Sequence, residues 1–173
     1  MPLPPRVSRV AWLPDSLFDV LQQESLRTAP HETGGVLMGY WTHQFQEVVI
    51  CKTIGPGPKA KHGLTFFQPD HDWQEREIAR IYHDSGRYVT YLGDWHSHPG
   101  GPNTLSLKDR LTLCRIAYHQ QARAAMPLMG IIAGENWALT IWNQEKSKIF
   151  NCVPFPRIGV MKIRQFSATC FST

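Results

Sequence analysis

The stretch from residue 88 to residue 109 constrains the fold most, because it reads as a strand, a tight loop and a helix in succession. Residues 88–95 are rich in β-branched and aromatic side chains, which is typical of a strand. Pro99 and the Gly-Gly-Pro-Asn run after it predict a loop, and a helix is expected from Ser106 to about residue 122. Side chains two positions apart in a strand point to the same face. His96 and His98 should therefore project together at the strand end.

Asp109 would lie in the first turn of the predicted helix, from which its carboxylate could point back to the two histidines. Two imidazoles and a carboxylate form a ligand set that zinc takes when one position stays open for water. The Ser106-x-x-Asp109 run also resembles a capping box, with Asp in place of the usual Glu or Gln. Both interpretations can hold together, because Ser106 can cap the helix while Asp109 binds a metal.

Glu32 is a candidate general base, although it lies far upstream of the ligand motif. Gly34 and Gly35 follow it closely, and glycines allow backbone to approach a site. Zinc held by three protein ligands lowers the pKa of the water bound at its open position to about 7, and a nearby carboxylate can accept the proton of that water. The alternative is a surface Glu in a turn before a strand at residues 36–41.

The His96-Ser97-His98-Pro99 run, the seven-residue gap, Ser106-x-x-Asp109 and the upstream Glu32-Thr-Gly-Gly together resemble the JAB1/MPN/Mov34 metalloenzymes, also called the JAMM family. The resemblance covers roughly residues 10–145 and implies a curved mixed sheet flanked by helices, of the cytidine-deaminase-like type. It implies one Zn²⁺ held by His96, His98 and Asp109, with Glu32 as general base and Ser106 as a donor to the oxyanion.

The same resemblance implies an isopeptidase acting on a ubiquitin-like protein or its conjugate. The short chain is most similar to bacterial deconjugases of anti-phage, CBASS-type operons, whose partners include E1-like and E2-like enzymes. Such deconjugases would cut after the C-terminus of the modifier or of a conjugated bacterial enzyme. Two alternatives stay open: a processing peptidase for a sulfur-carrier protein, and a non-catalytic zinc scaffold. Three ligands and a poised acid argue against the scaffold, since structural sites usually have four protein ligands.

Composition predicts one globular domain. Hydrophobic residues make up 42% and charged residues 18% of the 173 residues, which excludes a disordered chain. A net charge of +4 with scattered basic residues does not favour nucleic-acid binding. No apolar run is long enough for a membrane span, and the N-terminus lacks the apolar core of a signal peptide. Four widely spaced cysteines favour reduced thiols. A cytoplasmic protein without membrane contact is expected.

Hydrophobic periodicity predicts α/β (α+β) alternation in a domain spanning residues 1–153, followed by a tail at 154–173 that docks on the core. Within the helix from Ser106, one apolar set recurs at helical spacing. The loop at 54–63 and the strand at 64–67 could form one side of a groove for an extended peptide. The predicted helices are 14–27, 70–85 and 106–122. The predicted strands are 35–41, 45–53, 64–67, 88–95, 128–133, 137–142 and 148–153. The apolar set in the helix from Ser106 is Leu107, Leu111, Cys114 and Tyr118.

Overall fold

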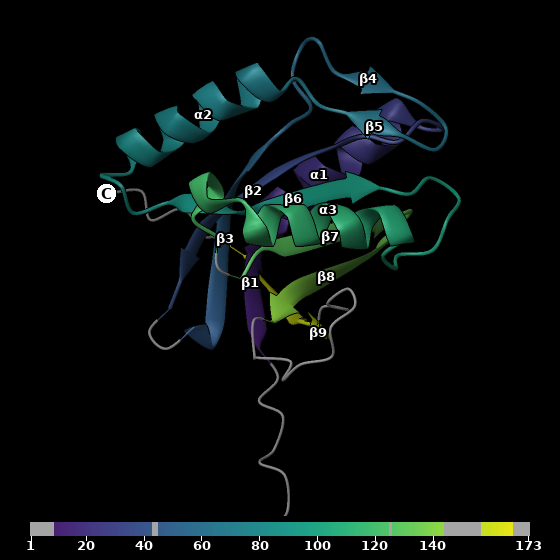
Figure 1. The fold of residues 1–173 in the computed structure, drawn as a ribbon. Coiled ribbons are helices and arrows are strands. Elements are labelled where there is room, and N and C mark those ends of the chain that lie inside the picture. Colours follow the sequence, from purple (N-terminus) through teal and green to yellow (C-terminus); the bar gives the residue numbers. More distant parts are fainter. Residues whose placement is uncertain (1–8, 43–44, 125, 144–156, 168–173) are drawn as a thin grey trace, which may run out of the picture.

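The computed structural model describes residues 9–42, 45–124, 126–143 and 157–167, which form a mixed sheet and three α-helices (Figure 1). Within these ranges, no helix has the length and apolar character needed to cross a lipid bilayer. In chain order the elements are β1 (Val10–Pro14), α1 (Asp15–Thr28), β2 (Gly34–Trp41), β3 (Glu47–Ile54), β4 (Lys61–His62), β5 (Phe67–Gln68), α2 (His71–Asp84), β6 (Thr90–Ser97), α3 (Leu107–Tyr118), the 3₁₀ turn η2 (Gln120–Ala122), β7 (Leu128–Ala133), β8 (Asn136–Asn143), β9 (Arg157–Val160) and β10 (Lys162–Phe166).

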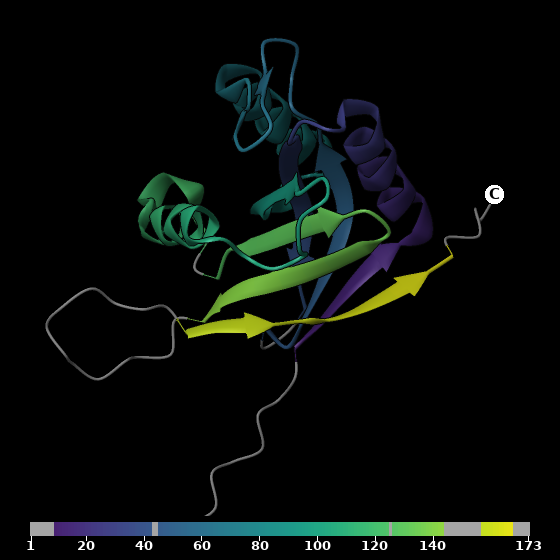
Figure 2. The same cartoon turned by 90° about the vertical axis from the view of Figure 1, so that its right-hand side faces the viewer.

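The main sheet has eight strands in the order β10-β1-β3-β2-β6-β7-β8-β9. Its two outermost strands are consecutive parts of one segment, because only Met161 separates β9 from β10. β9 pairs antiparallel with β8, whereas β10 pairs in parallel with β1. The sheet therefore curves until this last segment bridges its two ends, as the yellow strands show beneath β8 and β1 in Figure 2.

The helices cover the two faces of the sheet, and the strand period decides which residues each helix contacts. On β2, Leu37 belongs to the core that includes Leu21 of α1, whereas Val36 and Met38 pack with residues of α2. β7 divides in the same way, because its neighbouring residues alternate between the α1 core and the cluster with α3. These central strands are buried on both faces, which explains their nearly continuous apolar sequences.

The expected α/β fold, a curved mixed sheet flanked by helices in a single domain, is confirmed. β1 was not predicted, because its five residues end in a proline and carry little periodic signal. The predicted strand at 64–67 is displaced to β5, since the chain turns at 64–66, and the predicted loop at 54–63 contains β4. The helix expected to reach residue 122 ends at Tyr118, and the 3₁₀ turn η2 follows it. The predicted strand at 148–153 lies outside the described residues, as does the proposed boundary at 153/154.

α3 does not turn its regularly spaced apolar set toward the sheet. Leu107, Leu111 and Tyr118 are 71%, 50% and 63% exposed. The buried residues of the helix are Asp109 and Leu113, which lie one turn apart on the same face. Because Asp109 points inward from the first turn, its face becomes the inner face, and of the predicted set only Cys114 packs against the buried cluster around Leu113.

Candidate metal centre

β6 brings His96 and His98 to the face of the sheet that α2 and α3 cover. Trp95 is buried in the core on the α1 side, so the alternating histidines project to the other side. His96 lies in register with Gly34 of β2 and Ile131 of β7, which places it in the middle of the sheet. The strand runs two residues beyond its predicted end and includes His96. The expectation that both histidines project to one side is confirmed by a ring-centroid distance of 4.8 Å.

Asp109 comes to the histidines from the first turn of α3. The Ser106 Oγ accepts a hydrogen bond from the Asp109 N–H at 3.2 Å, and the Ser106 N–H donates to the Asp109 Oδ2 at 2.7 Å. This reciprocal pair is a capping box with Asp at the third position, as the sequence predicts. The box fixes the rotamer of Asp109, so one motif both begins the helix and orients a carboxylate.

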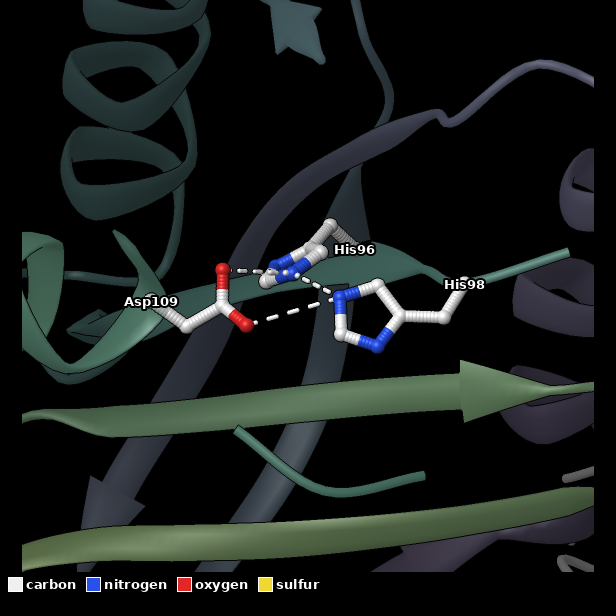
Figure 3. A group of neighbouring side chains, drawn as sticks. All are labelled: His96, His98 and Asp109. Carbon is white, nitrogen blue, oxygen red and sulfur yellow. Dashed lines mark hydrogen bonds and ion pairs between the residues drawn. The ribbon is translucent and has the colours of Figure 1, made fainter. Parts of the chain in front are cut away.

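The three side chains converge on one point (Figure 3). The Nε2 atoms of His96 and His98 are 2.9 Å apart. The carboxylate oxygens of Asp109 lie 3.1 Å from the Nε2 of His96 and 3.4 Å from the Nε2 of His98. Ligands at the zinc-bond lengths of 2.0–2.1 Å in a tetrahedral site are about 3.3 Å apart. The spacing of the donor atoms therefore fits a small divalent cation such as zinc.

The protonation pattern of His98 supports the same conclusion. Its Nδ1 lies 3.0 Å from the Pro102 carbonyl, which can only accept, so Nδ1 carries the proton and leaves the lone pair of Nε2 free. When Nε2 is protonated as well, it donates to Asp109 instead, and this hydrogen bond raises the pKa of His98. Burial disfavours the charged form of Asp109, but hydrogen bonds from both histidines and Ser106 hold its pKa well below the usual range. The carboxylate is thus a charged ligand at any ordinary pH.

Glu32 and Ser106 line an open pocket of about 430 Å³ together with His98 and Asp109. Glu32 precedes β2 and is partly buried. It shares this pocket with His98 and Asp109, two of the three residues of the cluster. The Ser106 Oγ accepts a hydrogen bond at the cap, so its own proton remains available for a group in the pocket. The structure therefore brings together all five residues that the sequence singles out.

Two contacts that sequence reasoning missed connect Glu32 to its surroundings. The Thr33 N–H donates to the Ser97 Oγ at 3.0 Å, and both residues are fully buried. His62 places its Nδ1 2.9 Å from the Glu32 carbonyl. Gly34 is needed for packing, because a Cβ there would lie 2.9 Å from both the His96 Cβ and the Phe67 ring. Ser97 could have been found from the sequence, because it lies between two predicted metal ligands. His62 stood in a predicted loop, where no sequence signal marked it.

Comparisons with known proteins agree with this geometry. The family model of prokaryotic homologues of the JAB domain matches residues 14–148. A Sinorhizobium fredii protein named "Probable metalloprotease y4qB" is 38% identical over 137 residues, which cover 78% of this chain and 83% of that protein. A CD-NTase/cGAS isopeptidase of Enterobacter hormaechei is 28% identical over 123 residues, covering 69% of this chain and 65% of that protein.

The fold also matches a solved structure. Protein DSY2949 from Desulfitobacterium hafniense, whose structure was determined in solution, superposes with a TM-score of 0.64. The superposition covers 91% of this chain and 93% of that one at 15% sequence identity, which bears on the fold alone. The family model, the first relative and the His-His-Asp cluster together show that this chain belongs to the prokaryotic JAB-domain family and is a metalloprotease of the JAMM type.

Proposed function

We propose that this protein is a zinc-dependent isopeptidase that cleaves the amide bond after the C-terminal residue of a ubiquitin-like protein or of a conjugated bacterial enzyme. The observation that carries the proposal is the cluster of His96, His98 and Asp109 beside a pocket that also contains Glu32. Three protein ligands leave a position open, as catalytic zinc sites do. One Zn²⁺ per chain, bound there, would supply a Lewis acid and a water of lowered pKa.

The protein groups around that position have separate tasks. Glu32 accepts the proton of the attacking water and delivers it to the leaving amine. Ser106 donates its free hydroxyl proton to the oxygen of the attacked carbonyl, where negative charge develops. Asp109 remains ionised throughout, because its hydrogen bonds stabilise the charged form. The roles of all five residues are part of the proposal.

The surroundings of the pocket support an extended peptide as the substrate. The β4–β5 hairpin (residues 61–68) lines the pocket through Leu64 and Thr65, and Leu64 and the neighbouring Phe66 are 67% and 46% exposed. The start of α3 lines it through Ser106, Lys108 and Asp109, and Leu107, which lies between them in the chain, is 71% exposed. Exposed apolar side chains beside the pocket can hold an extended C-terminal segment whose last amide enters it. The relatives named CD-NTase/cGAS isopeptidase favour a conjugated nucleotidyltransferase as the substrate, and hence a part in antiviral defence.

The test uses a bacterial nucleotidyltransferase joined through its C-terminus to the ε-amino group of a lysine on a carrier protein. Zinc-loaded enzyme should release the carrier, and chelation should stop the reaction until zinc is added back. Glu32→Gln should lower kcat by about 10²–10⁴ and keep the zinc, because the amide is a poor base. Asp109→Asn should lose zinc as well.

The exposed Glu75 on α2 provides the matched control, and Glu75→Gln should cleave at the wild-type rate. Equal cleavage by wild type and Glu32→Gln, or full cleavage in chelator, would contradict the proposal. A linear C-terminal extension of the same nucleotidyltransferase, tested in parallel, separates processing from deconjugation. Faster cleavage of the linear extension would favour the processing peptidase.

A further inference from the structure

The backbone of Glu32 is held by the β4–β5 hairpin and not by a strand of the main sheet. The Glu32 N–H donates to the Gly63 carbonyl at 2.8 Å. The Glu32 carbonyl accepts a hydrogen bond from the Nδ1 of His62 at 2.9 Å. A carbonyl can only accept, so the Nδ1 of His62 carries a proton. Two successive hairpin residues thus hold both backbone polar groups of the residue that we assign as general base.

The peptide unit between Glu32 and Thr33 is fixed at both of its ends. Its carbonyl binds His62, and its N–H, which belongs to Thr33, binds the Ser97 Oγ at 3.0 Å. Ser97 lies between the two histidine ligands on β6 and in turn donates its N–H to the Thr33 carbonyl at 2.8 Å. One end of the unit is therefore tied to the metal-ligand strand, and the other end depends on a single side chain of the hairpin.

The ring of His62 is itself held in place. It is partly buried, and its centroid lies 5.5 Å from that of Phe67, its partner across the hairpin. The Phe67 ring in turn lies against Gly34, two residues after Glu32. Packing against Phe67 and partial burial limit the rotation of the imidazole, so the hydrogen bond to Glu32 has a defined direction.

We propose that His62 is a positioning residue for Glu32. It holds the Glu32–Thr33 peptide unit at the angle that turns the carboxylate of Glu32 into the pocket. The hairpin that borders the peptide groove thereby also sets the geometry of the base. This inference rests on the proposed function, in which Glu32 accepts the proton. A displacement of about 1 Å in a catalytic group can cost a factor of about 10² in rate. The loss of one hydrogen bond affects folding stability much less, so the effect of His62 should appear in the rate.

The experiment compares His62→Ala, His62→Asn and His83→Ala in the zinc-loaded protein, with the conjugate substrate described above. His62→Ala removes the donor, whereas the side-chain amide of Asn can donate at a similar reach. His83 is exposed on α2 and provides the control. We expect His62→Ala to lower kcat at least tenfold with KM and zinc content unchanged. His62→Asn should recover most of kcat, and His83→Ala should match the wild type.

A double-mutant cycle tests whether His62 acts through Glu32. In the Glu32→Gln background, His62→Ala should lower the residual rate by less than twofold, because the base that it positions is already absent. Wild-type kcat in His62→Ala, an equally slow His62→Asn, or a tenfold loss that persists in the Glu32→Gln background would each overturn the inference. A raised KM at unchanged kcat would also overturn it, by placing His62 in substrate binding. The proposed function fails separately, if Glu32→Gln itself is fully active.

Discussion

Met161 offers the sharpest test of the way the sheet closes. It is the single residue between β9 and β10, and only 4% of it is exposed. Its side chain belongs to the core that contains Leu13 of β1 and Leu139 of β8, and its N–H donates to the Leu139 carbonyl at 2.9 Å. Met161→Ala keeps that backbone hydrogen bond and removes only the side-chain packing.

The expected cost follows from burial. Truncating a buried methionine to alanine destabilises proteins by about 2–5 kcal/mol, depending on how far the cavity collapses. Neighbours from several strands of a closed sheet leave little room for collapse, so we expect about 3 kcal/mol. For a chain of this size, that corresponds to a fall in Tm of about 6–12 °C. The loss is a large part of the total stability of a typical domain.

The assay is thermal and urea unfolding followed by circular dichroism, with Val160→Ala as the matched control. Val160 is the preceding residue and is 76% exposed, so its truncation should cost less than about 0.5 kcal/mol. Equal shifts in the two variants, or a loss below about 1 kcal/mol for Met161→Ala, would refute the idea that this segment closes the core.

Three further predictions concern the site and its rims. Gly34→Ala should destabilise the protein by about 1–3 kcal/mol and weaken zinc binding, because the new Cβ meets the His96 Cβ. Gly55→Ala is the control and should be neutral, since a Cβ there meets nothing within 4 Å. Melting curves and zinc analysis check both variants. Burial raises the pKa of Asp94 to about 6, although a hydrogen bond from a tyrosine opposes the shift. The folded protein therefore binds this proton more tightly than the unfolded chain, so the free energy of unfolding should fall between about pH 4 and pH 6 and level off above. Thermal melts in chelating buffer should show this fall in the free energy of unfolding, of at most about 3 kcal/mol, and Asp94→Asn should remove it. A fall of the same size in the variant would assign the pH dependence to other groups. Replacing Leu64 and Phe66 by Ser should raise KM for the conjugate about tenfold with kcat unchanged, and steady-state kinetics that show a lower kcat instead would argue against a peptide-binding rim.

Local sequence rules accounted for the ligand cluster. The period of two in a strand put His96 and His98 on one face, and the capping-box spacing put Asp109 in the first turn of α3. Each rule acts over a few residues, so each could be applied without knowing the fold. Glu32 was different, because its place beside the cluster follows from the pairing of β2 with β6, in which Gly34 lies opposite His96. The glycines after it and the resemblance to a family suggested its role in advance, but no local rule placed it beside the motif.

Periodicity, helix caps and ligand spacing are local properties, so they were enough to predict the class of fold, most of its helices and strands, and the ligand types of the site. The tertiary structure alone decided which faces are buried and what holds the base. Val10 pairs with Lys162 across almost the whole chain, and no local pattern records that pairing. α3 turns Asp109 and Leu113 inward and leaves Leu107, Leu111 and Tyr118 exposed, because the position of the ligand outweighs the hydrophobic period. The hydrogen bond from His62 to Glu32 likewise exists only once the hairpin has folded over β2, since residues so far apart meet through packing and not through sequence proximity.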